Sequence, residues 1–266
     1  MTTIQTDVSA EALVTAIRAN MCDFFRHLSK SNPAERFENE QFTRWYRPLP
    51  HLWFNGVLSS NPPLEDADLF IVETLGYFRG KGVQAFTWWM EPHLKPAEWE
   101  PALSKHGFGF SDNTPGMAVD LYELNDALQP TEGFEICSVD DAESLHTWVD
   151  IFLNGYGLPS AWESMTFDLW LQLGLDLPIR NYLGYLNGKP VSTSTVFYGG
   201  GTFIVWRRCP PHAAKALGRR SRSNHCRMHV KWAIASGSCN LRIWASTFTK
   251  SSASGIYVRS STFICR

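Results

Sequence analysis

The chain has 266 residues, of which 44% are apolar, and carries 24 basic side chains against 26 acidic ones. This length allows one large or two ordinary domains, and the apolar content is typical of a soluble globular protein. No apolar run is long enough to span a bilayer and the N-terminus has no signal-peptide core, so we expect no membrane association. Six cysteines without regular spacing argue against a disulfide framework, and we expect a cytoplasmic protein.

The near-neutral charge hides a strong asymmetry along the chain. Residues 203–266 hold 12 of the basic side chains, ten serines and four of the six cysteines, but no Asp or Glu. A folded cytosolic segment of this size without a carboxylate is unusual. The composition therefore changes abruptly near residue 202.

The first half of the chain predicts alternating helices and strands. Residues 9–30 and 64–78 have apolar side chains at helical spacing, and a Gly-Lys-Gly sequence stops the second of these helices. This order favours an α/β layer architecture for residues 1–124, followed by a linker at 125–133. The other predicted elements are strands at 44–46, 52–54, 83–88 and 116–121 and a helix at 96–106.

The second half begins with a predicted strand and two helices. Asp140 with Glu143 forms a capping box for a helix that Gly155 ends, and Ser160 with Glu163 forms a second capping box. The strand covers residues 134–139, and the second helix ends at residue 173.

The clearest local signal in the chain is a β-hairpin within residues 180–201. Two alternating apolar runs flank Asn187-Gly188, which is the strongest short-range hairpin sequence. Three consecutive glycines follow the second run.

A strand, two helices and an antiparallel hairpin in this order resemble the GNAT superfamily of N-acetyltransferases. The resemblance covers residues 134–201 directly, and the first half, with FRGKGVQAFTWW and LSKHGFGF, resembles a degenerate copy. It implies two GNAT-like α/β layers with mixed, mostly antiparallel sheets, the second incomplete after its hairpin. In the family, the hairpin leads to a fourth strand, an acetyl-CoA turn of the form Arg/Gln-x-x-Gly-x-Gly, and a helix. Residues 202–266 contain none of these, so we expect a basic tail in which 203–266 are irregular or poorly packed.

The codons of this tail are compatible with the missing elements in another reading frame. From the third base of the Lys231 codon, the possible codons of residues 231–255 allow the GNAT-like string VGYRIGVLQSSDMGFHVYKKFGFR. Two of its glycines are obligatory, because Trp followed by Ala, at 232–233 and 244–245, must give Gly in that frame.

The same offset also restores the upstream elements. Residues 203–209 become YCVATMP, which resembles the fourth strand, and residues 214–218 become Gln-Gly-Ile-Gly, the core of the acetyl-CoA turn. We therefore expect a frameshift within residues 199–202.

The resemblance implies acetyl-CoA as co-substrate, bound at a helix N-terminus, and no metal. It also implies a tyrosine that protonates the leaving thiolate, which the second frame would encode across Phe248 and Thr249. Because the protein has neither that tyrosine nor the turn, no cofactor-binding or catalytic residue is assigned. On the acceptor side, the loop between the two helices makes Tyr156 and Trp162 candidate wall residues. Both also fit a packing role in the core, and Glu163 is a candidate base whose capping position explains it without function.

Two further patterns in the tail have weaker functional interpretations. The arginines at 207–208 and 219–222 resemble a nucleic-acid patch, but a charge cluster alone specifies no groove or base contact. We therefore expect neither nucleic-acid nor metal binding. The potential zinc ligands match no familiar spacing, and they are Cys209, His225, Cys226 and His229.

The sequence thus predicts a GNAT-type N-acyltransferase that moves an acetyl group from acetyl-CoA to an amine, inactive as written because the CoA-binding turn is missing. The acceptor, a small molecule or a peptide, stays open, as does the oligomeric state. The alternative is a non-catalytic, two-lobed binding protein whose basic tail binds an acidic or nucleic-acid partner.

Overall fold

The computed structural model describes residues 6–7, 9–31, 35–49, 51–52, 54–59, 64–90, 96–120, 132–199, 202–208, 230–234 and 258–265. The chain divides into two compact units, each assembled from distant segments: Met1–Asn20 with Gly116–Tyr257 (unit 1), and Met21–Pro115 with Val258–Arg266 (unit 2). The predicted boundaries near residues 124 and 134 fall largely on residues 121–131, outside the described residues, and stay predictions. No helix in the described part of the chain is long and apolar enough to cross a membrane.

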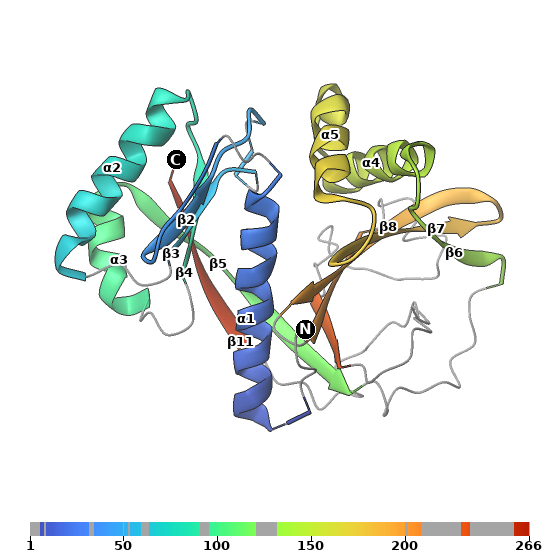
Figure 1. Ribbon diagram of the computed structural model, residues 1–266, viewed down its shortest axis with the longest axis horizontal. Coiled ribbons are helices and arrows are strands. Elements are labelled where there is room, and N and C mark those ends of the chain that lie inside the picture. Colours follow the sequence, from blue (N-terminus) through green and yellow to red (C-terminus); the bar gives the residue numbers. More distant parts are fainter. Residues whose placement is uncertain are drawn as a thin grey trace, which may run out of the picture. The chain divides into compact units, whose positions relative to one another are not determined.

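Unit 2 contains a mixed sheet with strand order β1-β2-β3-β4-β11-β5 and helices packed on it (Figure 1). β3 and β4 are parallel, whereas β1 and β2, β2 and β3, and β4 and β11 are antiparallel. Its elements are α1 (Ala10–Ser29, from residue 21 onward), β1 (Arg36–Glu38), β2 (Phe42–Trp45), β3 (Gly56–Ser59), η2 (Leu64–Asp66), α2 (Ala67–Gly80), β4 (Phe86–Met90), α3 (Pro96–Lys105), β5 (Phe108–Asp120, to residue 115) and β11 (Val258–Cys265).

One face of this sheet forms the main core with α2. Phe70 of α2 lies 4.5 Å from Phe42 and 5.0 Å from Trp88, measured between ring centroids. Phe78 of the same helix stacks on Phe86 at 4.0 Å. Successive side chains of a strand point to opposite faces, so the core aromatics occupy alternate strand positions.

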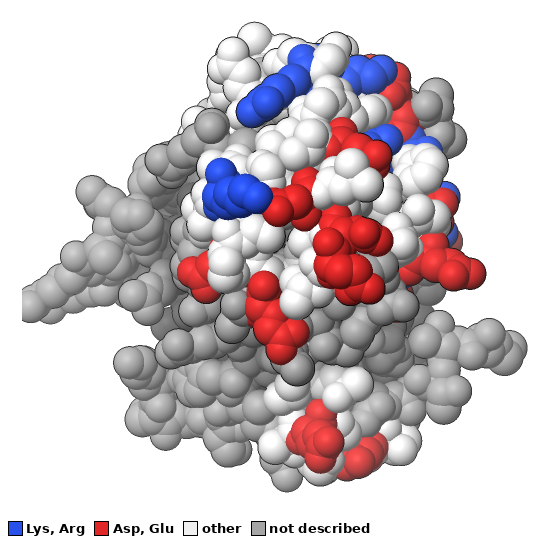
Figure 2. All heavy atoms as spheres, turned by 90° about the vertical axis from the view of Figure 1, so that its left-hand side faces the viewer, with Lys and Arg blue, Asp and Glu red and all other residues white. Residues whose placement is uncertain are grey.

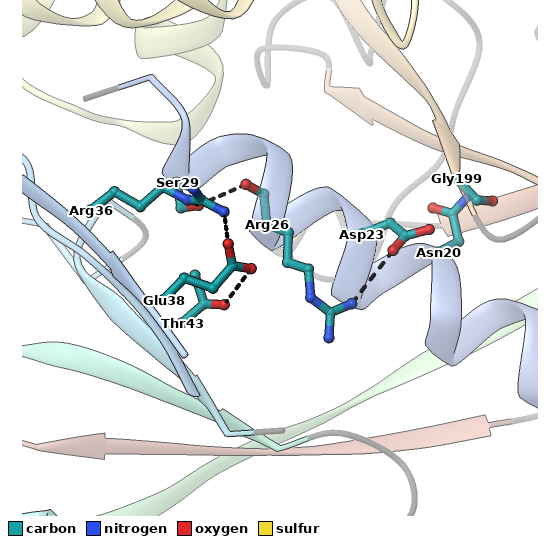
Figure 3. Close-up of polar contacts among 8 residues, drawn as sticks. All are labelled: Asn20, Asp23, Arg26, Ser29, Arg36, Glu38, Thr43 and Gly199. Atoms are coloured by element: carbon teal, nitrogen blue, oxygen red, sulfur yellow. Dashed lines mark hydrogen bonds and ion pairs between the residues drawn. The ribbon is translucent and has the colours of Figure 1, made fainter. Parts of the chain in front are cut away.

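The C-terminal part of α1 covers the opposite face. Phe25 stacks on Trp45 at 5.6 Å between ring centroids, and its ring lies tilted against that of Trp89 at 4.2 Å. The end of the helix is tied to β1, because Arg36 Nε donates to Ser29 Oγ at 2.9 Å (Figure 3). The sheet of unit 2 is therefore covered on both faces, as a layered α/β architecture requires.

The buried side chain of Asn55 holds the loop between β2 and β3. Its Oδ1 accepts from the Arg47 N–H at 2.9 Å, and its Nδ2 donates to the carbonyls of Leu49 and His51 at 2.8 and 3.3 Å. The Asn55 carbonyl accepts from the Thr87 N–H at 3.1 Å. One fully buried amide thus fixes the backbone path that leads into β3.

This loop also corrects one sequence expectation. The strand predicted at 52–54 is wrong, because Leu52 lies in a turn and Phe54 in a bend, and β3 begins only at Gly56. The aromatic run suits a strand by propensity, but the hydrogen bonds of the loop override that preference.

Tyr77 of α2 lies among charged side chains at the edge of the unit 2 core. Its hydroxyl donates to Glu35 Oε2 at 3.1 Å, and Lys81 Nζ lies 2.7 Å from Glu35 Oε1. The Arg44 guanidinium lies 3.6 Å from the centre of the Tyr77 ring. Burial and the hydrogen bond to Glu35 raise the pKa of Tyr77 to about 12.

Acidic side chains gather on the side of the molecule shown in Figure 2. Glu65, Asp66 and Asp68 lie in the first turns of η2 and α2, where a negative charge complements the helix dipole. Asp68 also binds Lys105 Nζ at 2.7 Å and His106 Nε2 at 2.6 Å, which ties α2 to the end of α3.

Unit 1 contains the strand order β10-β9-β8-β7-β6, in which all neighbours are antiparallel. Residues 116–120 of β5 pair in parallel with β10. The helices α4 and α5 lie over β7 and β8 (Figure 1). The elements are β6 (Phe134–Ser138), α4 (Ala142–Tyr156), η4 (Ser160–Trp162), α5 (Glu163–Leu173), β7 (Ile179–Leu186), β8 (Lys189–Gly199), β9 (Thr202–Arg208) and β10 (Val230–Ile234).

The predicted hairpin is confirmed as β7 and β8. Asn187 and Gly188 both have positive φ, at 51° and 73°, as a two-residue type I′ turn requires. Gly184 in β7 allows a close approach, because an added Cβ would lie 2.3 Å from Ser192 Oγ and 2.7 Å from the Phe134 ring.

The helix α4 begins one residue later than predicted. Its capping box joins Asp141 to Ser144, rather than Asp140 to Glu143. The Ser144 hydroxyl and N–H both donate to Asp141 Oδ1, at 2.7 and 2.8 Å, and they lower the pKa of Asp141.

The helix also ends later than predicted. Gly155 lies inside α4, and the chain leaves the helix at Gly157, whose φ of 66° is left-handed. Both glycines are possible helix ends in the sequence, but the turn that follows requires positive φ at Gly157.

The expectation that residues 203–266 are irregular is wrong for three segments, which form β9, β10 and β11. Val, Ile, Phe, Trp and Thr are frequent in these segments, and such residues favour strands in any sequence context. β9 continues the sheet by pairing with β8 from Gly199↔Thr202 to Thr193↔Arg208. The rest of the tail lies outside the described residues.

We predict that Asn55→Ala lowers the free energy of unfolding by about 2–3 kcal/mol, because it leaves buried backbone groups without partners. Asn39→Ala is the matched control: Asn39 is exposed and caps a local turn through the N–H groups of Gln41 and Phe42, so its loss should cost about 1 kcal/mol or less. Urea denaturation measures both. Equal losses would contradict the central role of Asn55.

The raised pKa of Tyr77 predicts a loss of folding stability at high pH. The folded state holds the Tyr77 proton more tightly than the unfolded state, in which the pKa is about 10. Its contribution is therefore complete below about pH 10 and disappears as the pH rises towards about 12. We expect the stability of wild type relative to Tyr77→Phe to fall over this window in denaturant titrations. A pH-independent difference between the two proteins would contradict the assignment.

Candidate acceptor site

The candidate site lies where the α4–α5 pair meets the hairpin in unit 1. The loop between the helices is short and internally hydrogen-bonded: Leu158 N–H donates to the Leu153 carbonyl at 2.9 Å, and Trp162 N–H to the Pro159 carbonyl at 3.0 Å. Such bonds fix the loop relative to the two helices. They give the residues at both ends of the loop defined positions.

Tyr156 is the last residue of α4 and the half-buried end of a row of aromatic rings. Its ring lies 4.9 Å from Phe152, which stacks on Trp148 at 4.9 Å. Trp148 meets Trp170 of α5 edge-on at 4.8 Å. The inner rings of this row hold α4 to α5, so the packing interpretation accounts for most of the cluster.

Trp162, also half-buried, occupies the N-cap position of α5, whose backbone is capped by no side chain. The structure thus places Tyr156 and Trp162 at opposite ends of one short loop. Whether they form a wall of an acceptor pocket stays a prediction.

A histidine–carboxylate pair joins α4 to α5. His146 Nδ1 lies 2.9 Å from Glu163 Oε1, and the His146 ring stacks on Phe167 at 3.9 Å. The predicted capping box between Ser160 and Glu163 is therefore wrong, because the Glu163 carboxylate faces His146 instead. An accessible imidazole next to a carboxylate can accept a proton from an amine. No local sequence signal indicates this pair, because its members are 17 positions apart.

The central strands of unit 1 carry an unusual run of buried polar side chains. Asn181 of β7 is 1% exposed, and its Oδ1 accepts from the Thr195 hydroxyl at 2.7 Å. Its Nδ2 has no partner among the described residues, and neither has Ser194 Oγ of β8. A buried donor without an acceptor costs about 1–3 kcal/mol. Asn181 Nδ2 and Ser194 Oγ are therefore buried polar groups of this sheet that make no hydrogen bond within the described residues. The polar run in β8 comprises Ser192, Thr193, Ser194 and Thr195.

At its other side, the hairpin is anchored by α1. Asn20 Nδ2 donates to the carbonyl of Gly199, the last residue of β8, at 2.6 Å (Figure 3). Asn20 is fully buried. This bond fixes the chain at the point where β8 turns into β9.

The edge of β9 away from β8 is occupied by β10. A strand–helix–strand crossover between neighbouring strands of one sheet makes them parallel. β10 instead runs antiparallel to β9, with Lys231↔Val205 and Ala233↔Phe203 as Cα partners. The backbone of β9 is thus engaged in pairing with β10, and the described residues do not fit acetyl-CoA. The region of the expected phosphate turn, 214–218, and the potential zinc ligands lie outside the described residues, within which no group of acidic, His or Cys side chains is suited to a metal.

No family model and no curated protein matches the chain. Among solved structures, a GCN5-related N-acetyltransferase from Kribbella flavida is 12% identical, with a TM-score of 0.55 over 98% of this chain and 95% of that chain. A second structure of that description from the same organism is 14% identical, with a TM-score of 0.42 over 97% and 69% of the two chains. A protein of unknown function from Staphylococcus epidermidis is 12% identical, with a TM-score of 0.46 over 86% and 91%. The first of these likenesses shows that the chain has a GNAT-like fold, and at this identity it shows the fold alone.

Proposed function

We propose that the chain derives from a GNAT-type N-acyltransferase that transfers an acetyl group from acetyl-CoA to an amine, and that a frameshift within residues 199–202 has removed its cofactor-binding half. The observation that carries the proposal is the change at the end of β8. Up to that point the strand, helix and hairpin order follows the family. Beyond it, the chain has no carboxylates, and β10 runs opposite to the direction that a crossover helix would impose.

The acceptor half supports a direct transfer to an amine. The half-buried rings of Tyr156 and Trp162 flank the loop between α4 and α5, and they are the proposed walls of the acceptor pocket. The pair His146 and Glu163 is a candidate general base, since the carboxylate can orient the imidazole. No step that involves acetyl-CoA is assigned to this chain, because the described residues do not fit it. The chain is therefore proposed to lack acetyltransferase activity. Its proposed location is the cytoplasm.

A second candidate rests on the charge of the tail. With 12 basic and no acidic side chains in residues 203–266, the tail could attract an acidic protein or nucleic acid. In that case the protein is a non-catalytic binding module. Its binding would weaken steeply with salt, because charge neutralisation releases counterions.

Acetyl-CoA separates these functions in a thermal unfolding experiment. A ligand that binds only the folded state stabilises it by about 2.7 kcal/mol at a concentration of 100 Kd. We expect no shift in Tm for the chain as written and a clear rise for a chain whose codons after residue 199 are read in the corrected frame. Two ligands serve as controls. Desulfo-CoA, which carries no acetyl group, is added to the corrected chain, and acetate is added to both chains.

Two outcomes contradict the proposed function. A Tm rise for the chain as written would show that the cofactor site is intact. No rise for either chain, together with salt-sensitive DNA binding by the chain as written, would favour the binding module.

A further inference from the structure

The strand β11, from residues 258–265, lies between β4 and β5 in the sheet. It pairs antiparallel with β4 through Thr262↔Trp89, Phe263↔Trp88, Ile264↔Thr87 and Cys265↔Phe86. The opposite edge of β4 pairs in parallel with β3. Both edges of β4 are therefore occupied, and β11 supplies one of the two.

The strand that receives β11 lies at the centre of the core. Phe86, Thr87 and Trp88 are only 2%, 1% and 0% exposed. Trp88 also donates through Nε1 to Ser59 Oγ at 2.8 Å and meets the ring of Phe108 edge-on at 5.4 Å. An open edge at β4 would thus leave buried backbone N–H and carbonyl groups without partners, which is costly.

Chain connectivity makes β11 a separable part of unit 2. Apart from Val258–Arg266, this unit is the continuous segment Met21–Pro115, and the intervening residues belong to unit 1. The described element that precedes β11 in the sequence is β10, which belongs to unit 1. The strand therefore joins β4 from a segment distant in the sequence, as a tethered peptide would.

The occupant of this edge has no acidic side chain and no proline, and its last four residues before Arg266 are Thr262, Phe263, Ile264 and Cys265. Addition of a strand to a sheet edge is driven by main-chain hydrogen bonds, which any extended segment without proline can make. Side chains that favour strands strengthen such pairing. These properties define the class of peptide that the edge accepts.

We propose that the edge of β4 is a strand-binding site for extended, β-prone peptides that dock antiparallel to Phe86–Trp89, with residues 258–265 as its tethered occupant. A peptide with the sequence of residues 255–266, GIYVRSSTFICR, binds the same edge in trans when the tethered strand is removed. This site is independent of the proposed acetyl transfer, because it lies in unit 2 and involves no residue of the acceptor site.

The test uses the full chain with Phe263→Pro and Ile264→Pro together. Consecutive residues of an antiparallel strand alternate between bonded and non-bonded pairs, so one of two adjacent prolines must remove an N–H that faces β4. The matched control is the full chain with Phe263→Val and Ile264→Val, which keeps both N–H groups and the strand propensity. Binding of a fluorescein-labelled peptide 255–266 is measured by polarisation under reducing conditions, next to a labelled peptide with the two prolines.

We expect the proline variant to bind the wild-type peptide at least tenfold more tightly than the valine variant does, since the tethered strand still competes in the latter. The proline peptide should bind neither protein. In hydrogen-exchange measurements, residues 86–89 should lose protection in the proline variant and regain it when the wild-type peptide is added.

Equal affinity of the two protein variants for the wild-type peptide would overturn the proposal, as would unchanged protection of residues 86–89. If the proline variant precipitates, refolding it with excess wild-type peptide should return soluble protein that contains the peptide. Failure of the wild-type peptide to rescue more protein than the proline peptide would also overturn the proposal. A dimer of the wild-type chain that the peptide dissociates would show that a second copy can supply the same strand.

Discussion

The antiparallel direction of β10 beside β9 limits the kind of cofactor site that unit 1 can form. An acetyl-CoA site in this fold depends on a fourth strand, a phosphate turn and a crossover helix that returns the chain parallel to that strand. Here β9 is present, but β10 lies antiparallel along its edge. From β6 to β8, the fold consists of α4, α5 and the hairpin. The GNAT-like order of elements therefore continues to β9, and the strand beside β9 departs from it.

The two units depend on pairing over long sequence distances. In unit 2, β4 is the buried centre of the sheet and takes its last neighbour from residues 258–265. In unit 1, Asn20 of α1 holds the carbonyl of Gly199. Such contacts tie segments that are distant in the sequence into each folded unit. A sheet edge accepts a new strand more readily than a phosphate turn accepts a new loop, because pairing uses the backbone and the turn requires glycine at fixed positions.

Local signals allowed much of unit 1 to be predicted. Asn187-Gly188 indicated the hairpin because few other sequences tolerate positive φ at two consecutive positions, and the helical spacing of Leu145, Trp148 and Phe152 indicated α4. The exact caps were less predictable, since Asp140 and Asp141 are both suitable N-caps and Gly155 and Gly157 both suitable C-caps. The pair His146 and Glu163, the pairing of β11 with β4 and the order of β9 and β10 were not predictable. They arise from tertiary packing and carry no periodic or motif signal in the sequence.

The most direct test of the central claim is the nucleotide sequence that encodes residues 199–266. We expect the second frame to encode the Gln-Gly-Ile-Gly core of an acetyl-CoA turn over residues 214–218 and a tyrosine across Phe248 and Thr249, each in the GNAT order. We also expect a single insertion or deletion within the codons of residues 199–202 relative to intact homologous genes. Codons that cannot encode these elements in the second frame would contradict the frameshift, and the tail would then belong to a protein with another function.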